Sequence, residues 1–162
     1  MIKVDSSSLI YAIKLNLIEY IKNLYNEIII SPIVKKEVID NVKDKGYSDA
    51  IIAEQFLEQG IIKIHHSKTI IKNLNLGTGE IEIISLAKEE DCPCILDDIK
   101  AQKIGIKLNV NLKSILLILL ELLKKKIIAL KQYNQLLEKY ARIVNLSQIE
   151  LWLYKKLGDL IQ

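Results

Sequence analysis

Short apolar runs alternate with longer amphipathic segments along most of the chain. The apolar runs are rich in β-branched residues and predict strands at 2–4, 27–30, 61–65, 94–96 and 109–112. Each run is continuous rather than alternating with polar residues, which is typical of parallel strands that are buried on both faces. The pattern through residue 126 therefore predicts an α/β domain with a parallel sheet.

Helices are predicted between these strands, because apolar residues there recur at helical spacing. The serines at 6–8 offer N-cap hydroxyls for the first helix, Ser31 and Pro32 are favoured first residues of the second, and Gly60 is a favoured stop. We expect a loop at 43–48. The expected helices span 9–21, 32–41, 49–58, 77–90, 100–108 and 113–125.

The C-terminal part of the chain has a different pattern. Two helices are predicted at 132–143 and 147–157, with no strand between them. Ser147 and Glu150 have the spacing of a capping box, and Gly158 suits a C-terminal stop. We expect an α/β domain at 1–126 and a helical extension at 127–162, packed on the same domain.

Composition excludes several classes of protein. The chain has 162 residues, of which 50% are hydrophobic, and 23 Lys and Arg against 20 Asp and Glu give a net charge of +3. This excludes a disordered chain, and two cysteines exclude a disulfide framework. We find no signal peptide, and the apolar run at 115–120 is too short to span a membrane. We expect a cytoplasmic protein; its small positive charge permits nucleic-acid binding without indicating it.

Acidic residues occur where the predicted sheet would place a ligand. Ligands of open parallel sheets bind beyond the carboxyl ends of the strands. Asp5 follows the first strand, and Asp97 and Asp98 follow the fourth. Glu37 lies two turns into the helix after the second strand, and Glu80 lies in the first turn of the helix after the glycines.

These acids suggest metal-assisted chemistry if they converge. Carboxylates that share a dry site raise one another's pKa, and a bound divalent cation removes that cost. Mg²⁺ and Mn²⁺ prefer oxygen ligands and can polarise a phosphate, so hydrolysis of a phosphodiester is the reaction indicated. Singly, Glu37 is more simply explained as a solvated helix residue and Glu80 by the helix dipole. Their joint order favours the functional interpretation.

Two other features have weaker functional interpretations. The pair His65-His66 and the pair Cys92 and Cys94 suggest zinc, but Cys-x-Cys is a poor match to the spacing of zinc sites. Lysines at 124–126 either contact a nucleic-acid backbone or solvate the end of an apolar helix, and we favour the second interpretation.

The order of the motifs resembles a known family. The segments VDSSSLI, IIISPIVKKEVI, LGTGEIEIISLA and CILDDIKAQKIGIKL are similar to those of PIN domains, the nuclease fold of VapC-type toxins. Within that family the chain resembles an uncharacterised prokaryotic branch of predicted nucleic-acid-binding proteins. The resemblance implies a three-layer α/β/α fold with four to five parallel strands and additional C-terminal helices.

The resemblance also implies an activity and a site. It implies a ribonuclease that uses Mg²⁺ or Mn²⁺ on single-stranded or structured RNA, forms a homodimer and has a small antitoxin as its partner. The site residues carried over by position are Asp5, Glu37, Glu80 and Asp98 as the catalytic quartet, Asp5, Asp97, Asp98 and Glu80 as metal ligands, and Ser7 as a supporting hydroxyl.

One position departs from the family pattern. Leu96 stands where a threonine is usual, so the choice between Asp97 and Asp98 as the main ligand stays open. The departure also keeps an alternative function, in which the PIN fold has lost efficient catalysis and binds RNA or protein. A phosphoryl-transfer or receiver-like protein is a weaker third possibility, because it does not explain Glu37 or Glu80.

Overall fold

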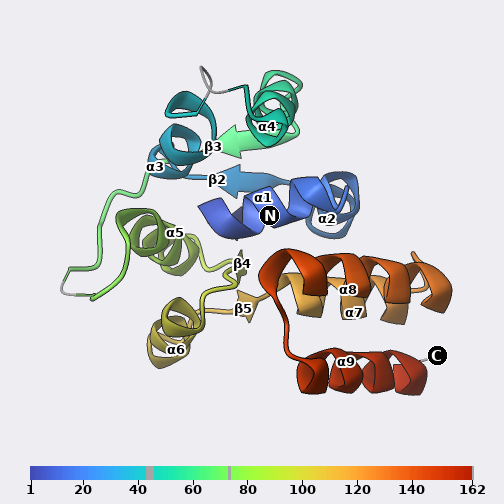
Figure 1. The fold of residues 1–162 in the computed structure, drawn as a ribbon. Coiled ribbons are helices and arrows are strands. Elements are labelled where there is room, and N and C mark those ends of the chain that lie inside the picture. The colour runs from blue at the N-terminus through green and yellow to red at the C-terminus, as the bar shows by residue number, and fades with distance from the viewer. Residues whose placement is uncertain (43–45, 73, 162) are drawn as a thin grey trace. The chain divides into compact units, whose positions relative to one another are not determined.

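The computed structural model describes residues 1–42, 46–72 and 74–161 (Figure 1). The chain forms two compact units, Met1–Lys113 and Ser114–Gln162. The first unit holds the sheet and the predicted acidic residues, and the second is helical. The sequence pattern placed its boundary at residue 126, one helix later. Residues 43–45 of the expected loop lie outside the described residues.

The first unit is built on a sheet of five parallel strands, which confirms the expected α/β class. The strand order is β3-β2-β1-β4-β5. Lys3 in the central strand β1 pairs with Ile29 on one side and Cys94 on the other. The strands are β1 Ile2–Val4, β2 Ile28–Ile30, β3 Ile62–Ile64, β4 Cys94–Ile95 and β5 Leu112–Lys113.

Helices cover both faces of this sheet. From the central strand β1 the chain adds β2 and β3 on one side, and it then returns to add β4 and β5 on the other side. Connections between parallel strands are right-handed, so the two directions place their helices on opposite faces. Helices α1–α4 therefore cover one face, and α5 and α6 cover the other. Contacts agree, since α2 packs on β2, α4 on β3, α5 on β1 and β4, and α6 on β5. The helices are α1 Ser6–Lys14, α2 Ile18–Tyr25, α3 Pro32–Lys35, a π-helical turn η1 Lys36–Asp40, α4 Ser48–Glu58, α5 Thr78–Glu89 and α6 Ile99–Lys107.

Two predicted helices of this unit differ in detail. The helix predicted at 9–21 is broken into α1 and α2, because Asn16 adopts a left-handed conformation with φ of 55°. The N-cap of α1 is Asp5 rather than a serine. The helix that begins at Ser31 and Pro32 starts as predicted, but it continues as the π-helical turn that contains Glu37. Such turns are frequent at functional sites.

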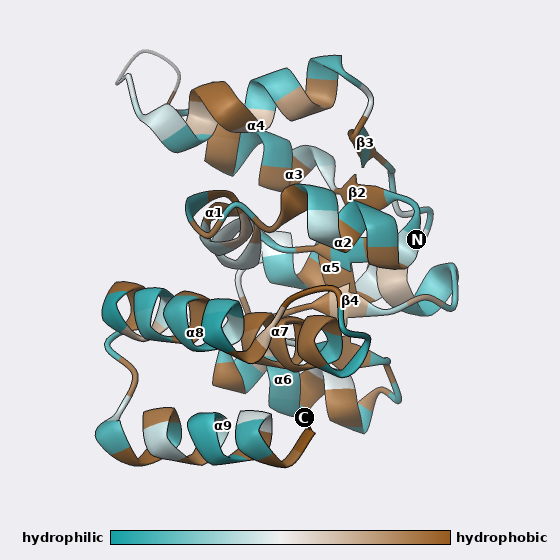
Figure 2. Ribbon diagram, turned by 90° about the vertical axis from the view of Figure 1, so that its right-hand side faces the viewer, coloured by the Kyte–Doolittle hydropathy of each residue, from teal (hydrophilic) through white to brown (hydrophobic). Residues whose placement is uncertain are grey.

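The second unit consists of α7 Ile115–Lys124, α8 Leu130–Val144 and α9 Gln148–Ile161. Figure 2 shows apolar and polar positions alternating along α8 and α9. The predicted capping box is confirmed, because the amide of Glu150 donates to the Ser147 hydroxyl over 3.2 Å and Ser147 donates back to Glu150. No helix in the described ranges is long and apolar enough to cross a membrane.

Gly158 does not end α9, so that prediction was wrong. The glycine is buried inside the helix, and the ring of Tyr133 on α8 lies against it. A Cβ at position 158 would lie 2.6 Å from Cε1 of Tyr133. Gly158 therefore serves the packing of two helices rather than termination.

Candidate active site

Asp5 is the buried centre of the acidic cluster. It follows β1, its side chain is 2% exposed, and its Oδ1 accepts a hydrogen bond from the amide of Ser8 over 2.9 Å. The pKa of Asp5 is raised to about 7, chiefly by burial; the charges of Asp97 and Glu80 contribute to the rise, and hydrogen bonds from Ser8 oppose it. Three carboxylates from separate parts of the chain therefore interact at this point.

The pairing of β1 with β4 brings Asp97 to Asp5. Val4 is opposite Ile95, so the residues that follow the two strands meet at one edge of the sheet. The hydroxyl of Ser8 donates a hydrogen bond to Oδ2 of Asp97 over 2.7 Å, and Ser8 is fully buried. One serine thus holds two carboxylates, one through its amide and one through its hydroxyl.

Asp98 has a different environment from its neighbour. Its side chain is exposed and caps α6 by accepting a hydrogen bond from the amide of Ala101 over 2.8 Å. Asp97 is half-buried and faces the Ser8 hydroxyl. Of the two adjacent acids, Asp97 is therefore the one whose charge acts on Asp5.

Glu37 and Glu80 complete the set of predicted acids. Glu37 is exposed on the π-helical turn and accepts a hydrogen bond from the Ser6 hydroxyl. A Cβ at Gly79 would lie 3.0 Å from Oε2 of Glu37, so the glycine allows the start of α5 to approach that carboxylate closely. Glu80 accepts a hydrogen bond from the amide of Gly77 over 2.9 Å and so stabilises the same helix start.

The serine positions could not be assigned from the sequence. Ser7, which the resemblance implies as the supporting hydroxyl, is exposed, whereas Ser6 and Ser8 bond to site carboxylates. Tyr11 was not among the predicted site residues; its pKa is raised by burial and by the charges of Asp97 and Asp5. The available signal was spacing, because Ser8 and Tyr11 are three residues apart on one helix face.

Comparison with known proteins identifies the family. Residues 1–155 match the DUF3368 family, which is described as a PIN domain. The chain is a PIN-domain protein. Three chains of solved structure also match. One is a PilT N-terminus domain protein from the hyperthermophilic archaeon Sulfolobus solfataricus P2, with 24% identity, a TM-score of 0.49 and coverage of 71% of this chain and 87% of that chain. No curated protein matches.

PIN domains are generally nucleases and typically use divalent metal ions, so the fit of this site to a cation can be tested. The donors are carboxylates, which hard cations such as Mg²⁺ prefer. The pKa of Asp5 is raised chiefly by burial, and the neighbouring charges of Asp97 and Glu80 add to the rise, so a bound cation would favour the ionised form. The donor set therefore fits a divalent cation chemically, although no three His, Cys, Asp or Glu side chains converge on one metal position in the described chain.

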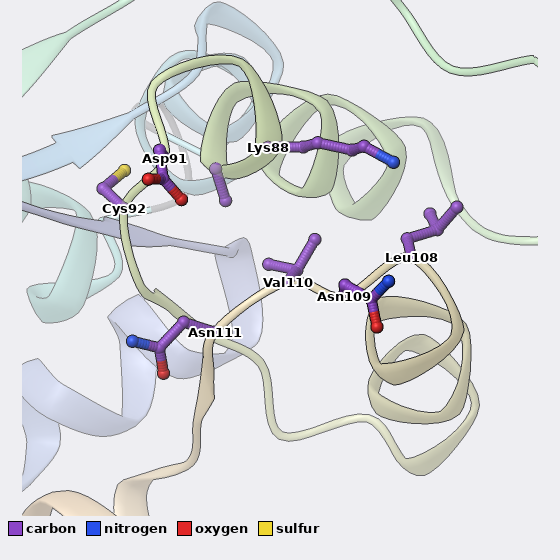
Figure 3. A pocket seen from close by; sticks show the side chains of 8 residues that line it. Lys88, Asp91, Cys92, Leu108, Asn109, Val110 and Asn111 are labelled. Carbon is purple, nitrogen blue, oxygen red and sulfur yellow. The ribbon is translucent and has the colours of Figure 1, made fainter.

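A separate cavity of about 320 Å³ lies away from these carboxylates (Figure 3). It is lined by residues that precede β4 and β5, among them Cys92 and Asn111, and by Lys88 and Asn109 at the ends of helices. Residues before parallel strands lie at the edge of the sheet opposite the edge that carries Asp5. The cavity of this PIN domain is therefore not part of the acidic site.

The residues that suggested zinc have other partners. Cys92 and Cys94 are free and buried, and burial raises the pKa of both thiols, which opposes the thiolate that zinc requires. Nδ1 of His65 lies 2.9 Å from Oε1 of Glu90, which also pairs with the buried Lys3. These contacts stabilise the fold, and they leave the carboxylate cluster as the chemical centre of the PIN domain.

Proposed function

We propose that this PIN domain is a ribonuclease that hydrolyses phosphodiester bonds of RNA and depends on Mg²⁺ or Mn²⁺. The observation that carries the proposal is the environment of Asp5, a buried carboxylate with a pKa of about 7 beside Asp97 and Glu80. Burying a carboxylate beside two like charges costs stability. Perturbed carboxylates grouped in this way are typical of functional sites.

In this proposal, Asp5 and Asp97 would hold the cation, and Glu80, whose charge also acts on Asp5, would bind it through a water. The bound cation would supply positive charge that stabilises the transition state of phosphodiester hydrolysis and lowers the pKa of a water. We assign Asp97 the role that the family resemblance gives to Asp98, because Asp97 faces Asp5 while Asp98 caps α6. Asp98 would then serve the site by fixing the start of α6.

The remaining polar residues orient these carboxylates. Ser8 fixes Asp5 and Asp97 relative to each other, since it bonds both from a fully buried position. Ser6 donates a hydrogen bond to Glu37, which lies at the exposed side of the carboxylate cluster. A carboxylate in this position can accept a proton or order a water near the substrate. The rigid support of a site by such bonds is what keeps reacting groups aligned.

The test is cleavage of a mixed pool of RNA by the purified protein with Mg²⁺, with Mn²⁺ and with EDTA, beside the variant Asp5→Asn. We expect cleavage with a divalent ion, and no cleavage with EDTA or in the variant. Calorimetric titration with Mn²⁺ gives a second readout, in which the variant should lose binding. Full activity of Asp5→Asn, or equal cleavage in EDTA, would contradict the proposal.

A second candidate function has a specific observation in its favour. No three potential ligands converge on one metal position within the described ranges, and Leu96 replaces the usual threonine of the family pattern. Both facts suit a PIN fold that binds RNA or protein with weak catalysis. Binding of the RNA pool without cleavage at any metal concentration would favour this candidate.

The resemblance to VapC-type toxins extends the proposal to a biological role. We propose a homodimeric toxin that is neutralised by a small antitoxin. Co-purification of the product of a neighbouring small gene with this chain, together with loss of RNA cleavage in the complex, would support that role. Unchanged cleavage in the complex would contradict it.

A further inference from the structure

Helix α6 carries an unusual concentration of positive charge. Lys100, Lys103 and Lys107 lie within its nine residues, all three are exposed, and the helix contains no acidic residue. These three charges equal the net charge of the whole chain, +3. Within the described part of the chain, no hydrogen bond or ion pair engages the three ammonium groups. Their charge is therefore available to a ligand.

The opposite face of α6 is fixed against the sheet. Gly105 lies so close to β5 that a Cβ there would come within 2.8 Å of the Leu112 side chain. The side-chain amide of Gln102 donates to the carbonyl of Leu96 over 2.7 Å, which ties the helix to the segment that carries Asp97. This packing directs the lysine face to solvent in a defined orientation.

The lysine face begins beside the acidic site. Asp97 is separated from α6 only by the capping residue Asp98, and Lys100 lies in the first turn of the helix. Lys100 to Lys107 spans about 10 Å at the usual helical rise. Two exposed isoleucines, Ile99 and Ile106, interleave with the lysines and are 66% and 65% exposed.

We propose that this α6 face, made of Ile99, Lys100, Lys103, Ile106 and Lys107, binds the phosphate backbone of single-stranded RNA that enters the carboxylate cluster. The proposal rests on the proposed ribonuclease function. A cluster of carboxylates repels a polyanion, so an approaching RNA strand needs neighbouring cations that are not already paired. Lysine binds phosphate as a point charge, and the isoleucines offer apolar surface to the unstacked bases of a single strand.

The first test measures binding rather than cleavage. A short, labelled, unstructured RNA is titrated with protein in EDTA at several KCl concentrations, for wild type and for Lys100→Gln/Lys103→Gln/Lys107→Gln. The association constant falls as salt rises, so the slope of its logarithm against log salt is negative. Loss of three phosphate contacts should make this slope less steep by about 2 for a single strand. The control replaces three other exposed lysines, Lys68, Lys88 and Lys131, with glutamine, and its slope should equal that of wild type.

The second test separates this proposal from the ribonuclease proposal. Bis(p-nitrophenyl) phosphate is too short to reach from the carboxylates along α6, so the α6 triple variant should hydrolyse it as wild type does while losing cleavage of RNA. A wild type that binds RNA through α6 but cleaves neither substrate would refute the nuclease and leave the binding surface standing. An α6 variant with wild-type salt slope and RNA cleavage would refute the binding surface alone. An equal loss of binding in the control triple would also refute it.

Discussion

The hydroxyl of Ser8 donates a hydrogen bond to Asp97, a residue 89 positions later in the chain. The same serine donates its amide to Asp5, so the two carboxylates are held by one buried residue. The family pattern expects a hydroxyl at position 96, where this chain has leucine. In this chain the hydroxyl that bonds to Asp97 comes from Ser8 on α1.

We predict that Ser8→Ala lowers metal affinity and RNA cleavage by about tenfold or more, the usual cost of removing a bond that orients a metal ligand. The lost buried hydrogen bond should also cost about 1 kcal/mol in the free energy of unfolding. Calorimetric titration with Mn²⁺ and urea denaturation measure the two effects. Ser7→Ala is the matched control, because Ser7 is exposed, and it should resemble wild type in both assays.

The adjacent acids Asp97 and Asp98 should respond differently to the same substitution. Asp97→Asn removes a charge that faces Asp5, and we expect cleavage to fall by about 100-fold. Asp98→Asn keeps an efficient N-cap on α6, so cleavage and stability should change little. Single-turnover cleavage of one RNA by both variants decides the assignment, and a larger loss in Asp98→Asn would reverse it.

The raised pKa of Asp5 predicts how stability depends on pH when no metal is present. Between the ordinary value of 3.8 and about 7, the folded chain keeps a proton that the unfolded chain has released. The free energy of unfolding should therefore fall as the pH rises through this window and stay low above it. Urea denaturation in EDTA from pH 3 to pH 8 measures this slope.

Asp5→Asn should remove that slope, because asparagine keeps the cap on α1 without a titratable charge. We expect the variant to be more stable than wild type at pH 8 by about 1 kcal/mol or more, and equally stable below pH 4. Added Mn²⁺ should stabilise wild type but not the variant. A variant less stable than wild type at pH 8 would show that the Asp5 charge contributes to the fold.

Gly158→Ala should destabilise the helical unit, although the same change inside an exposed helix stabilises it by about 0.5–1 kcal/mol. The new methyl group would meet the Tyr133 ring, and overpacking of this kind costs about 1–3 kcal/mol. Urea denaturation measures whether the free energy of unfolding falls or rises in this variant. Ile149→Ala is the control on the same helix, because Ile149 is 79% exposed and its loss should change stability by less than about 0.5 kcal/mol.

Local signals explain why much of the fold was predictable. The start at Ser31 and Pro32 and the capping box at Ser147 depend on residues within one turn, and both were predicted correctly. Of the acids that the resemblance implied, the structure brings the charges of Asp97 and Glu80 to Asp5, while Asp98 caps α6. The break at Asn16 was missed because the apolar spacing continues across it, so the pattern alone does not reveal the left-handed residue.

Side-chain partners across the sheet were beyond sequence reasoning. The choice between Asp97 and Asp98 depends on where β4 ends relative to β1, and a shift of one residue turns a side chain to the opposite face. The same holds for Ser6, Ser7 and Ser8, which are chemically identical and differ only in direction around α1. Gly158 was predicted to end its helix because the residue that requires a glycine there, Tyr133, lies on another helix and cannot be identified from local sequence.

The position of β1 at the centre of the sheet has a consequence during protein synthesis. Its neighbour β4 is made only after more than half of the chain, so Asp5 stays without Asp97 until that late strand has left the ribosome and paired. A nascent or truncated chain that ends before β4 consequently carries Asp5 and Glu80 but not Asp97. If the mature protein cuts RNA, this order of assembly protects the message and the ribosome that are producing it.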